Sequence, residues 1–385
     1  MKKYWKLIML ALFAFSLLGI HYVQGARQMN DSLTLHLETV YGDESVVQNR
    51  TFYGYYSQSY FMTHAAVTLE GYKTPVKGIF GTYDSYAPEM QPLIKQYHSF
   101  MRGKIFDPIY YYEDEERLLY VDIPTNNSRN ATKPITFNVS MLNKGDNSTS
   151  DFKAITVQSF PFDYVHVEKV QFVDGYIKVI VSARADEDAS VLYVFTIDEK
   201  KHTVIENMPL TTSNPGEDYV FHFMYDRYLF APQTNFLYGS SSEYIDLTPG
   251  GMDDENRREQ DFKLYKMDLK TMINEPIDVP EALQRTSSIT VATNEATYFV
   301  KENLNTIDLY SYHYDNNEWK HVELERSVSA SDAFIVNDVL YTTTYGNVGE
   351  SSIHAFDVAT GKHLYSGEIT SDNDEAFYFS VSSVK

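Results

Sequence analysis

Three short acidic runs are the densest groups of potential metal ligands in the sequence. They are Asp186-Glu187-Asp188, Asp253-Asp254-Glu255 and Asp372-Asn373-Asp374-Glu375. Carboxylate and amide oxygens are the ligands that Ca²⁺ takes, but a dedicated calcium loop alternates its ligands and places a glycine at its sharp turn. None of the three runs has that spacing. We therefore expect solvated charge at these positions and assign no metal-binding residue.

Catalytic constellations are equally scarce. The eleven histidines are scattered along the chain, and His64, His98, His202 and His321 are expected to be ordinary polar residues of strands or loops. There is no nucleophile elbow, phosphate loop, zinc-protease motif or dinucleotide-binding glycine motif. With 53 acidic residues, a carboxylate pair for glycoside cleavage remains open, but no spacing singles one out. No catalytic or cofactor-binding residue is assigned, and no cofactor is expected.

The elements that would position any such group form a repeat. Each copy contains a tyrosine-rich apolar strand, a turn, a strand that ends at Asp, and a short outer strand. The tyrosine-rich strands are residues 175–181, 227–231, 296–300 and 339–343, and the strands that follow end at Asp198, Asp268, Asp315 and Asp357. Each Asp is expected to bond the backbone of the turn that follows it, as Asx motifs do.

The spacing of these Asp residues indicates the architecture. Successive steps are 70, 47 and 42 residues, and the last two lie near the roughly 40–50 residues of one four-stranded propeller blade. The long first step contains residues 233–260, which are rich in Gly, Ser and acidic residues and read as an insertion. We therefore predict an all-β fold, a β-propeller of four-stranded blades.

Upstream segments supply further strands. Residues 107–112, 117–123, 135–139 and 152–157 would form one blade, and residues 33–40, 51–60, 65–69 and 77–83 another. Six blades result, or seven if residues 86–104 hold a degenerate one. Residues 88–101 are also the one stretch after the N-terminus that could be helical. Residues 375–381 are a strand left over after the last blade, and pairing with N-terminal strands would remove exposed edges and close the ring.

Two segments resemble repeats of known propeller families. Residues 353–365, in which a small-residue strand ends in Asp before Thr360-Gly361-Lys362, resemble the quinoprotein (PQQ-like) repeat, although Tyr365 stands where that repeat carries Trp. Residues 309–319, with a Tyr314-Asp315 turn before Trp319, resemble the end of a kelch repeat without its double glycine. The resemblance implies blade geometry alone, and neither quinone binding nor a partner follows from it.

The N-terminal residues have the pattern of a targeting segment. Lys2, Lys3 and Lys6 precede an apolar run over residues 7–18 that milder residues extend to Val23, as in secretory signals. The length lies between a cleaved signal and a spanning helix, so residues 1–25 are either a signal peptide or a membrane anchor, and residues 30–385 are the propeller domain. In both cases the basic end stays inside, and the propeller is exported, at the outer face of the cytoplasmic membrane or secreted.

Composition restricts the partners. The chain has no cysteine, so it has neither disulfides nor thiolate metal sites, and an exported chain of this kind is more typical of a Gram-positive bacterium than of a eukaryote. A net charge of −21 argues against nucleic acid and against contact with anionic lipid. Membrane contact is expected only through residues 7–23. We expect this charge mainly to keep the protein soluble in a salty or alkaline exterior. Among partners, it would favour cations, cationic ligands and basic protein patches.

Tyrosine runs leave two interpretations open. Tyr53-Gly54-Tyr55-Tyr56 and Tyr110-Tyr111-Tyr112 could present a sugar-stacking surface, but we favour packing between blades with hydroxyls at the rim. The same ambiguity holds for function. The sequence favours an extracytoplasmic binding module for a protein or cell-surface ligand, for example in an envelope sensing or regulatory system. The alternative is an exported enzyme acting on carbohydrate or a small molecule, with carboxylates, histidines and tyrosines converging on the propeller axis.

Overall fold

The computed structural model describes most of the chain after the leader. The described residues are 9, 13, 16, 19, 35–58, 61–73, 90–124, 134–159, 164–184, 191–210, 220–223, 236–244, 260–284, 289–293, 295–303, 306–325, 330–345, 351–371 and 378–384.

The described strands form six antiparallel sheets, which confirms the all-β prediction. Sheet 1 contains β25 (Tyr378–Val384), β2 (Phe52–Gln58), β3 (Phe61–Thr68) and β4 (Gly71–Lys73). Sheet 2 contains β5 (Tyr111–Glu113), β6 (Arg117–Asp122), β7 (Pro134–Asn143) and β8 (Thr149–Ser159). Sheet 3 contains β9 (Tyr164–Val173), β10 (Tyr176–Arg184), β11 (Val191–Asp198) and β12 (Thr203–Leu210).

The second half of the chain repeats the plan. Sheet 4 contains β13 (Val220–Phe223), β14 (Phe236–Tyr244), β15 (Gln260–Asp268) and β16 (Ile273–Ile277). Sheet 5 contains β17 (Ile289–Ala292), β18 (Ala296–Glu302), β19 (Ile307–His313) and β20 (Glu318–Glu323). Sheet 6 contains β21 (Asp332–Val336), β22 (Val339–Tyr345), β23 (Ser351–Asp357), β24 (His363–Ser371) and, outermost, β1 (Leu35–Gly42).

From residue 35 onward, the described helical segments are short. They are η1 (Glu44–Val46), α2 (Met90–Gln96), α3 (His98–Met101), η2 (Pro108–Tyr110) and η3 (Glu281–Leu283). Among the described residues, no helix is long and apolar enough to cross a membrane.

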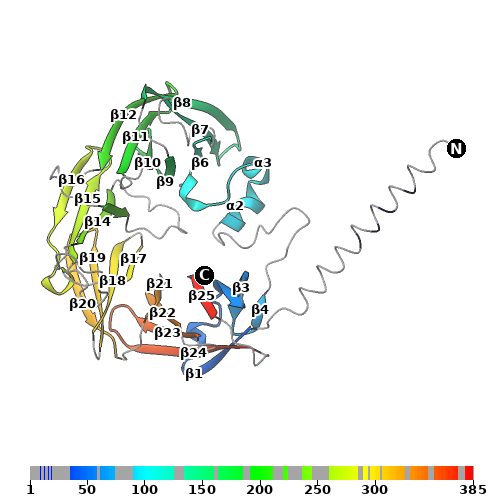
Figure 1. The fold of residues 1–385 in the computed structure, drawn as a ribbon, viewed down its shortest axis with the longest axis vertical. Helices are drawn as coiled ribbons and strands as arrows, with labels where there is room; N and C mark the ends of the chain where they lie inside the picture. Colours follow the sequence, from blue (N-terminus) through cyan, green and yellow to red (C-terminus); the bar gives the residue numbers. More distant parts are fainter. Residues whose placement is uncertain are drawn as a thin grey trace, which may run out of the picture.

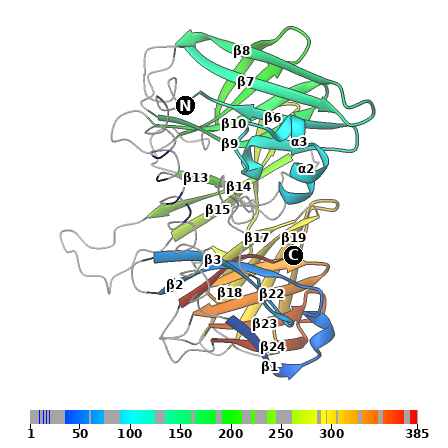
Figure 2. The ribbon, with the colours of Figure 1, turned by 90° about the vertical axis from the view of Figure 1, so that its right-hand side faces the viewer.

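The sheets follow one another in chain order around a common centre (Figure 1), and α2 and α3 lie between sheets 1 and 2. The view turned by 90° shows sheets 2 and 3 at one end of the molecule and sheets 1 and 6 at the other (Figure 2). Several four-stranded antiparallel sheets in this order are consistent with a β-propeller.

Strands from the two ends of the described chain close the ring, as we predicted from the strand left over after the last blade. Strand β25 pairs with β2, with Tyr55 opposite Ser380, and so supplies the first strand of sheet 1. Strand β1 pairs with β24, with Leu37 opposite Ile369. The assignment of residues 33–40 to the first blade was therefore wrong, because β1 covers the free edge of the last sheet instead.

Hairpin turns repeat with the sheets. Strands β9 and β10 are joined by Asp174 (φ 51°) and Gly175 (φ 83°), and β21 and β22 by Asn337 (φ 51°) and Asp338 (φ 60°). Two positive φ values match a type I′ turn, whose twist suits antiparallel strands and favours Asn, Asp and Gly.

The predicted Asx turns are confirmed after three of the four strands. Asp198 Oδ1 accepts a hydrogen bond from the Lys200 N–H at 2.9 Å. In the same way, Asp268 Oδ1 accepts from the Lys270 N–H at 2.8 Å, and Asp357 Oδ1 accepts from the Thr360 N–H at 2.8 Å. The fourth residue after each Asp has a positive φ: His202, Met272 and Gly361.

Two other turns complete this comparison. Asp315 differs, because its carboxylate bonds the next residue, Asn316. Asn143 begins an equivalent turn in sheet 2, with its Oδ1 2.8 Å from the N–H of Gly145 and a positive φ at Asn147. Sequence comparison missed this copy because Asn replaces Asp.

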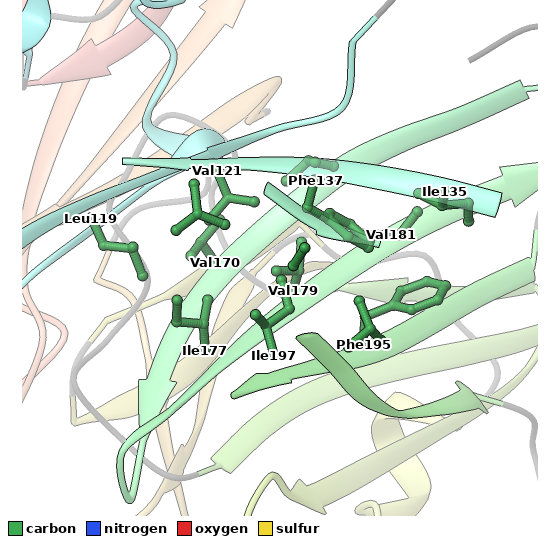
Figure 3. Close-up of a cluster of buried hydrophobic side chains, with 14 of the residues drawn as sticks. Leu119, Val121, Ile135, Phe137, Val170, Ile177, Val179, Val181, Phe195 and Ile197 are labelled. Atoms are coloured by element: carbon green, nitrogen blue, oxygen red, sulfur yellow. The ribbon is translucent and has the colours of Figure 1, made fainter. Parts of the chain in front are cut away.

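The core lies between neighbouring sheets. Figure 3 shows Val121 and Phe137 of sheet 2 packed against Val179 and Phe195 of sheet 3. On β10, Ile177 and Val179 face sheet 2, whereas Ile180 packs toward Tyr265 and Met267 of sheet 4. Because both faces of sheet 3 are buried at its centre, its two central strands, β10 and β11, are largely apolar rather than alternating with water-facing residues.

Two predictions concern residues 86–104. The helical prediction for residues 88–101 is confirmed by α2 and α3. A degenerate seventh blade was the wrong reading, because Met90, Leu93 and Phe100 recur at helical spacing and pack on Leu118 and Tyr120 of sheet 2.

The predicted insertion at residues 233–260 overlaps sheet 4. Strand β14 lies inside this range and pairs with β15, with Ser240 opposite Leu264. Only the connection at residues 245–259 separates these two strands, and it lies outside the described residues, as do residues 77–83 and 227–231. Of the leader, only residues 9, 13, 16 and 19 are described, as helix, so its export role stays a prediction.

Candidate functional site

Titratable and aromatic side chains gather where sheets 2 and 3 meet near their first strands. We call Tyr110, Tyr120, Asp122, Tyr164 and His166 the inner cluster. Strands β5 and β9 are the first strands of their sheets, and β9 lies against η2 and β5. The cluster lies at the end of the sheets where β9 begins and β6 ends. This is the opposite end from the tight β9–β10 turn.

Local sequence fixes the members of the inner cluster. Asp107 caps η2, with its Oδ1 3.2 Å from the N–H of Ile109, and Pro108 occupies the first turn. Proline suits this position because its missing N–H would have had no helical partner. Tyr110 is thereby held directly before β5. On β6, strand alternation places Tyr120 and Asp122 on the same face.

The rings form a chain of contacts across the two sheets. The centroids of Tyr120 and Tyr110 are 6.2 Å apart, those of Tyr110 and His166 are 6.0 Å apart, and those of His166 and Tyr164 are 6.1 Å apart. Tyr110 and His166 meet edge to face, whereas His166 and Tyr164 are stacked. The Tyr164 end of this row of rings is open to solvent, because Tyr164 is 50% exposed.

Asp122 is held in place from two sides. The Tyr120 hydroxyl donates to its Oδ2 at 2.8 Å, and the Asn138 amide donates to its Oδ1 at 2.7 Å. Burial raises the pKa of Tyr120 well above its usual range, and the Asp122 carboxylate raises this pKa further. Tyr120 therefore stays protonated and keeps donating to Asp122, which leaves the carboxylate half-buried and oriented.

A buried hydroxyl lies beside this pair. The ring of Tyr111 is 4.9 Å from that of Tyr120, its side chain is fully buried, and its hydroxyl has no hydrogen-bond partner in the described part of the chain. Burial raises the pKa of Tyr111 above its usual range. Such a group ordinarily bonds an ordered water or a ligand.

Lys104 borders the same face. Its Nζ donates to the Phe100 carbonyl at 2.7 Å and lies 4.2 Å from the centroid of the Phe100 ring. Burial lowers the pKa of Lys104, and the carboxylates of Asp151 and Asp122 oppose that shift.

The arrangement supports two kinds of chemistry. Aromatic faces beside an oriented carboxylate attract a cationic group. An imidazole, a protonated phenol and a carboxylate in one place also provide groups for proton transfer. In the described ranges, no group of three or more His, Cys, Asp or Glu side chains is arranged to hold a metal ion.

The residues singled out in the sequence lie apart. All three acidic runs fall outside the described residues, and for His64 only its backbone position, in β3, is described. His98 is exposed on α3, and His202 stacks on Phe152 at 4.1 Å. His321 lies on β20 with its Nε2 2.9 Å from Asp308 Oδ1.

The inner cluster itself was not predicted. The sequence predicts that Tyr110-Tyr111-Tyr112 packs between blades with its hydroxyls at the rim. Tyr112 packs between sheets 2 and 3 as predicted, whereas Tyr111 packs with α2, α3 and sheet 2 and its hydroxyl is buried. Asp107-Pro108 before the run was the local signal that Tyr110 ends a turn rather than continuing a strand. The contact between Tyr110 and His166 could not be predicted from the sequence, because it depends on how sheet 3 packs against sheet 2.

Comparison with solved structures finds low similarity. The β-propeller domain of the Trilobed protease from Pyrococcus furiosus is 9% identical, with 84% of this chain and 83% of that chain covered at a TM-score of 0.36. An uncharacterized protein from Listeria monocytogenes EGD-e is 10% identical at a TM-score of 0.34, with 67% of this chain covered, and this chain spans 63% of its length. An ulvan lyase of polysaccharide lyase family PL25 is 10% identical at a TM-score of 0.34, with coverages of 70% and 77%.

These neighbours include a propeller domain, but TM-scores below 0.5 support no functional argument. No family model and no curated protein matches the sequence. No match therefore supports the quinoprotein-type or kelch-type resemblance specifically.

Proposed function

We propose that the chain is an exported, six-bladed β-propeller that acts as a binding module, and that its inner cluster receives a cationic group of a protein or cell-surface ligand. The observation that carries this proposal is the row of rings formed by Tyr164, His166, Tyr110 and Tyr120, in which the Tyr120 hydroxyl donates to the oriented Asp122 carboxylate. The net charge of −21 supports it, because a negative field raises the encounter rate with positive partners. The basic and apolar leader supports export.

The location of the cluster adds support. Binding residues are concentrated on loops that a rigid scaffold holds. Tyr110 ends η2 directly before β5, and Tyr164 begins β9, so two members of the inner cluster lie at strand ends rather than in the middle of a sheet.

Affinity isolation from intact cells tests the proposal. The full-length tagged protein is expressed in a Gram-positive host, crosslinked on the cells and purified, alongside Asp122→Asn and Tyr164→Ala. We expect a surface-derived partner whose yield falls at least tenfold in both variants and decreases with added salt, because exposed charge attraction is screened. Tyr176→Ala, an exposed tyrosine on β10 outside the cluster, is the matched control. Absence of a partner, or equal recovery with Asp122→Asn, would refute the proposal.

A second candidate function is an exported enzyme that uses the same groups. His166, Tyr120 and Asp122 supply the histidine, tyrosine and carboxylate that proton transfer to a carbohydrate requires. Incubation of the full-length protein with soluble polysaccharides, followed by assay of newly formed chain ends, tests this candidate. Activity that His166→Gln abolishes would favour the enzyme over the binding module.

A further inference from the structure

A cavity of about 370 Å³ opens between sheets 4 and 5, away from the inner cluster. We call it the rim groove. Its volume lies within the range of about 300–1,000 Å³ that is typical of small-ligand sites. The lining side chains that matter here are Lys266, Glu275, Asp278, Tyr312, Asn317 and Trp319.

Cross-strand register places the two aromatic residues of the rim groove. Tyr312 on β19 pairs with Trp319 on β20, and the two ring centroids are 5.2 Å apart. Directly paired residues project from the same face of a sheet, and this face of sheet 5 is the one that meets sheet 4, as the packing of Trp319 and Phe299 with Leu264 shows.

Trp319 is fixed across the junction of the two sheets. Its indole N–H donates to the Asp278 carbonyl at 2.9 Å, and its ring lies 5.5 Å from that of Phe299. An aromatic ring held in one orientation offers a flat apolar face at little cost in side-chain entropy.

Asn317 arranges the polar wall. It adopts a positive φ of 57°, which Asn tolerates better than other non-glycine residues. Its Oδ1 accepts hydrogen bonds from Lys266 Nζ at 3.0 Å and from the Tyr312 hydroxyl at 3.1 Å. Its amide nitrogen forms no hydrogen bond with the part of the chain that the structure describes, so it is left as a donor.

Acceptors complete the lining. The side chains of Glu275 and Asp278 are exposed and form no hydrogen bond or ion pair with the part of the chain that the structure describes. Glu275 lies directly across from Lys266 on the neighbouring strand. The rim groove thus combines one cation, two carboxylates, an amide donor and the Trp319 ring, and the excess of one negative charge disfavours an anionic ligand.

The same face continues with a second aromatic pair. Tyr310 stacks on His321 at 4.5 Å, and Asp308 holds the imidazole through its Oδ1 at 2.9 Å. Residues two apart on a strand are separated by about 6.7 Å. The Trp319 ring and the pair of Tyr310 with His321 therefore lie about one such step apart, whereas the Tyr312 ring is 4% exposed and packs against Trp319.

We propose that the rim groove binds a saccharide that carries no negative charge, either neutral or amino-substituted. Sugar rings present apolar faces that pack on aromatic side chains, and their hydroxyl groups both donate and accept hydrogen bonds. The mixed donors and acceptors of Asn317, Glu275 and Asp278 beside Trp319 match this chemistry. A purely cationic side chain fits less well, because Lys266 occupies the same wall. This site is separate from the inner cluster and does not depend on its function.

Tryptophan fluorescence tests the proposal directly. The sequence contains only Trp5 and Trp319, so Trp5→Phe in the full-length protein, kept in mild detergent, leaves Trp319 as the sole reporter. The probes are the tetramers of glucose, N-acetylglucosamine and glucosamine, with hexalysine as the cationic comparison. We expect at least one saccharide to shift or quench Trp319 emission with saturation.

Two variants separate binding from misfolding. Asn317→Gly keeps the positive φ and removes the amide, and the pair Glu275→Gln with Asp278→Asn removes only charge. Each should weaken saccharide binding at least tenfold without changing the unfolding midpoint, whereas Tyr176→Ala and Asp122→Asn should have no effect. Saturation by hexalysine alone would make this a peptide site and overturn the proposal. No response to any probe would do the same.

Discussion

At the scale of single residues, the turn after the third strand of a sheet depends on one carboxylate. In sheet 6, Asp357 Oδ1 accepts the Thr360 N–H at 2.8 Å and the Thr360 hydroxyl at 2.6 Å. The turn ends at Gly361, with a φ of 72°, where an added Cβ would lie 2.2 Å from the Glu323 carbonyl oxygen of sheet 5. The same Asx turn therefore shapes the hairpin and allows the close approach of two sheets.

Replacing Asp357 tests this role. We expect Asp357→Ala to lower the free energy of unfolding by about 1 kcal/mol, because hydrogen bonds to a turn are lost. Asp357→Asn keeps an acceptor oxygen and should cost less. Urea unfolding followed by circular dichroism measures both. Equal losses in the two variants would show that hydrogen bonding to this oxygen is not what stabilises the turn.

The stabilising contribution of Asp357 is expected to decrease as the pH falls. The hydrogen bond from the Thr360 hydroxyl lowers the pKa of Asp357 below 3.8. A carboxyl group with a lowered pKa adds stability that is fully present above the unfolded pKa and is lost as the pH falls through the folded value. The difference in stability between the wild type and Asp357→Asn should therefore shrink between about pH 6 and about pH 3. A constant difference would contradict the assignment.

At the scale of elements, sheet 3 places an amine at its junction with sheet 4. Lys178 on β10 is 4% exposed, and its Nζ lies 2.9 Å from the Thr196 hydroxyl and 3.5 Å from the Met272 sulfur. Burial lowers its pKa, whereas the charges of Glu206 and Asp268 oppose the shift. Lys178 forms no ion pair with the residues that the structure describes, and a buried charge without such a partner weakens the junction.

Lys178→Met should therefore stabilise the protein, by about 1 kcal/mol near pH 7, because a side chain of similar length no longer buries a charge. The folded protein releases this proton at a lower pH than the unfolded chain, so wild-type stability rises with pH in the interval below 10.5. The advantage of the variant should then diminish near pH 10. Urea midpoints at the two pH values provide the measurement, and an advantage that grows with pH would contradict it.

Elements were the most predictable level. Type I′ turns at Asp174 and Asp338, and strands ending at Asp198 and Asp357, are encoded within a few residues, so the sequence predicted these hairpins. Residues 90–101 were also recognisable, because their apolar spacing is helical. Local signals cannot specify which distant strand covers a free edge, and β1 was therefore assigned to the wrong sheet.

Sites were less predictable for the same physical reason. The inner cluster brings Tyr110 to His166, and the rim groove brings Asp278 to Trp319, across neighbouring sheets. Each contact depends on how two sheets pack, whereas the sequence pattern reports only which residues share a face. The residues 309–319 that resembled a kelch repeat did mark one wall of the rim groove, but nothing in them indicated the opposite wall.

At the scale of the whole molecule, closure depends on Gly54. A Cβ at this position would lie 2.1 Å from the Ser380 carbonyl oxygen and 2.8 Å from the Phe379 ring of β25. We expect Gly54→Ala to lower the free energy of unfolding by roughly 2 kcal/mol, because overpacking a buried strand pair forces the backbone apart. Gly145→Ala, whose nearest neighbour would be Asn143 Oδ1 at 3.2 Å, is the control and should change stability by less than about 0.5 kcal/mol.

Hydrogen exchange locates the effect. Amides of β2 and β25 should exchange faster in Gly54→Ala, whereas amides of sheet 3 should change least, because the loss begins at the closure. Unchanged protection of β2 and β25 would show that ring closure tolerates the added methyl group.

The pairing of β25 with β2 sets an order of events during biosynthesis. Sheet 1 lacks its first strand until β25 has left the ribosome, so this sheet stays incomplete while every residue between β4 and β25 is being made. On the export route that we propose, sheet 1 would be completed only after β25 had also crossed the membrane.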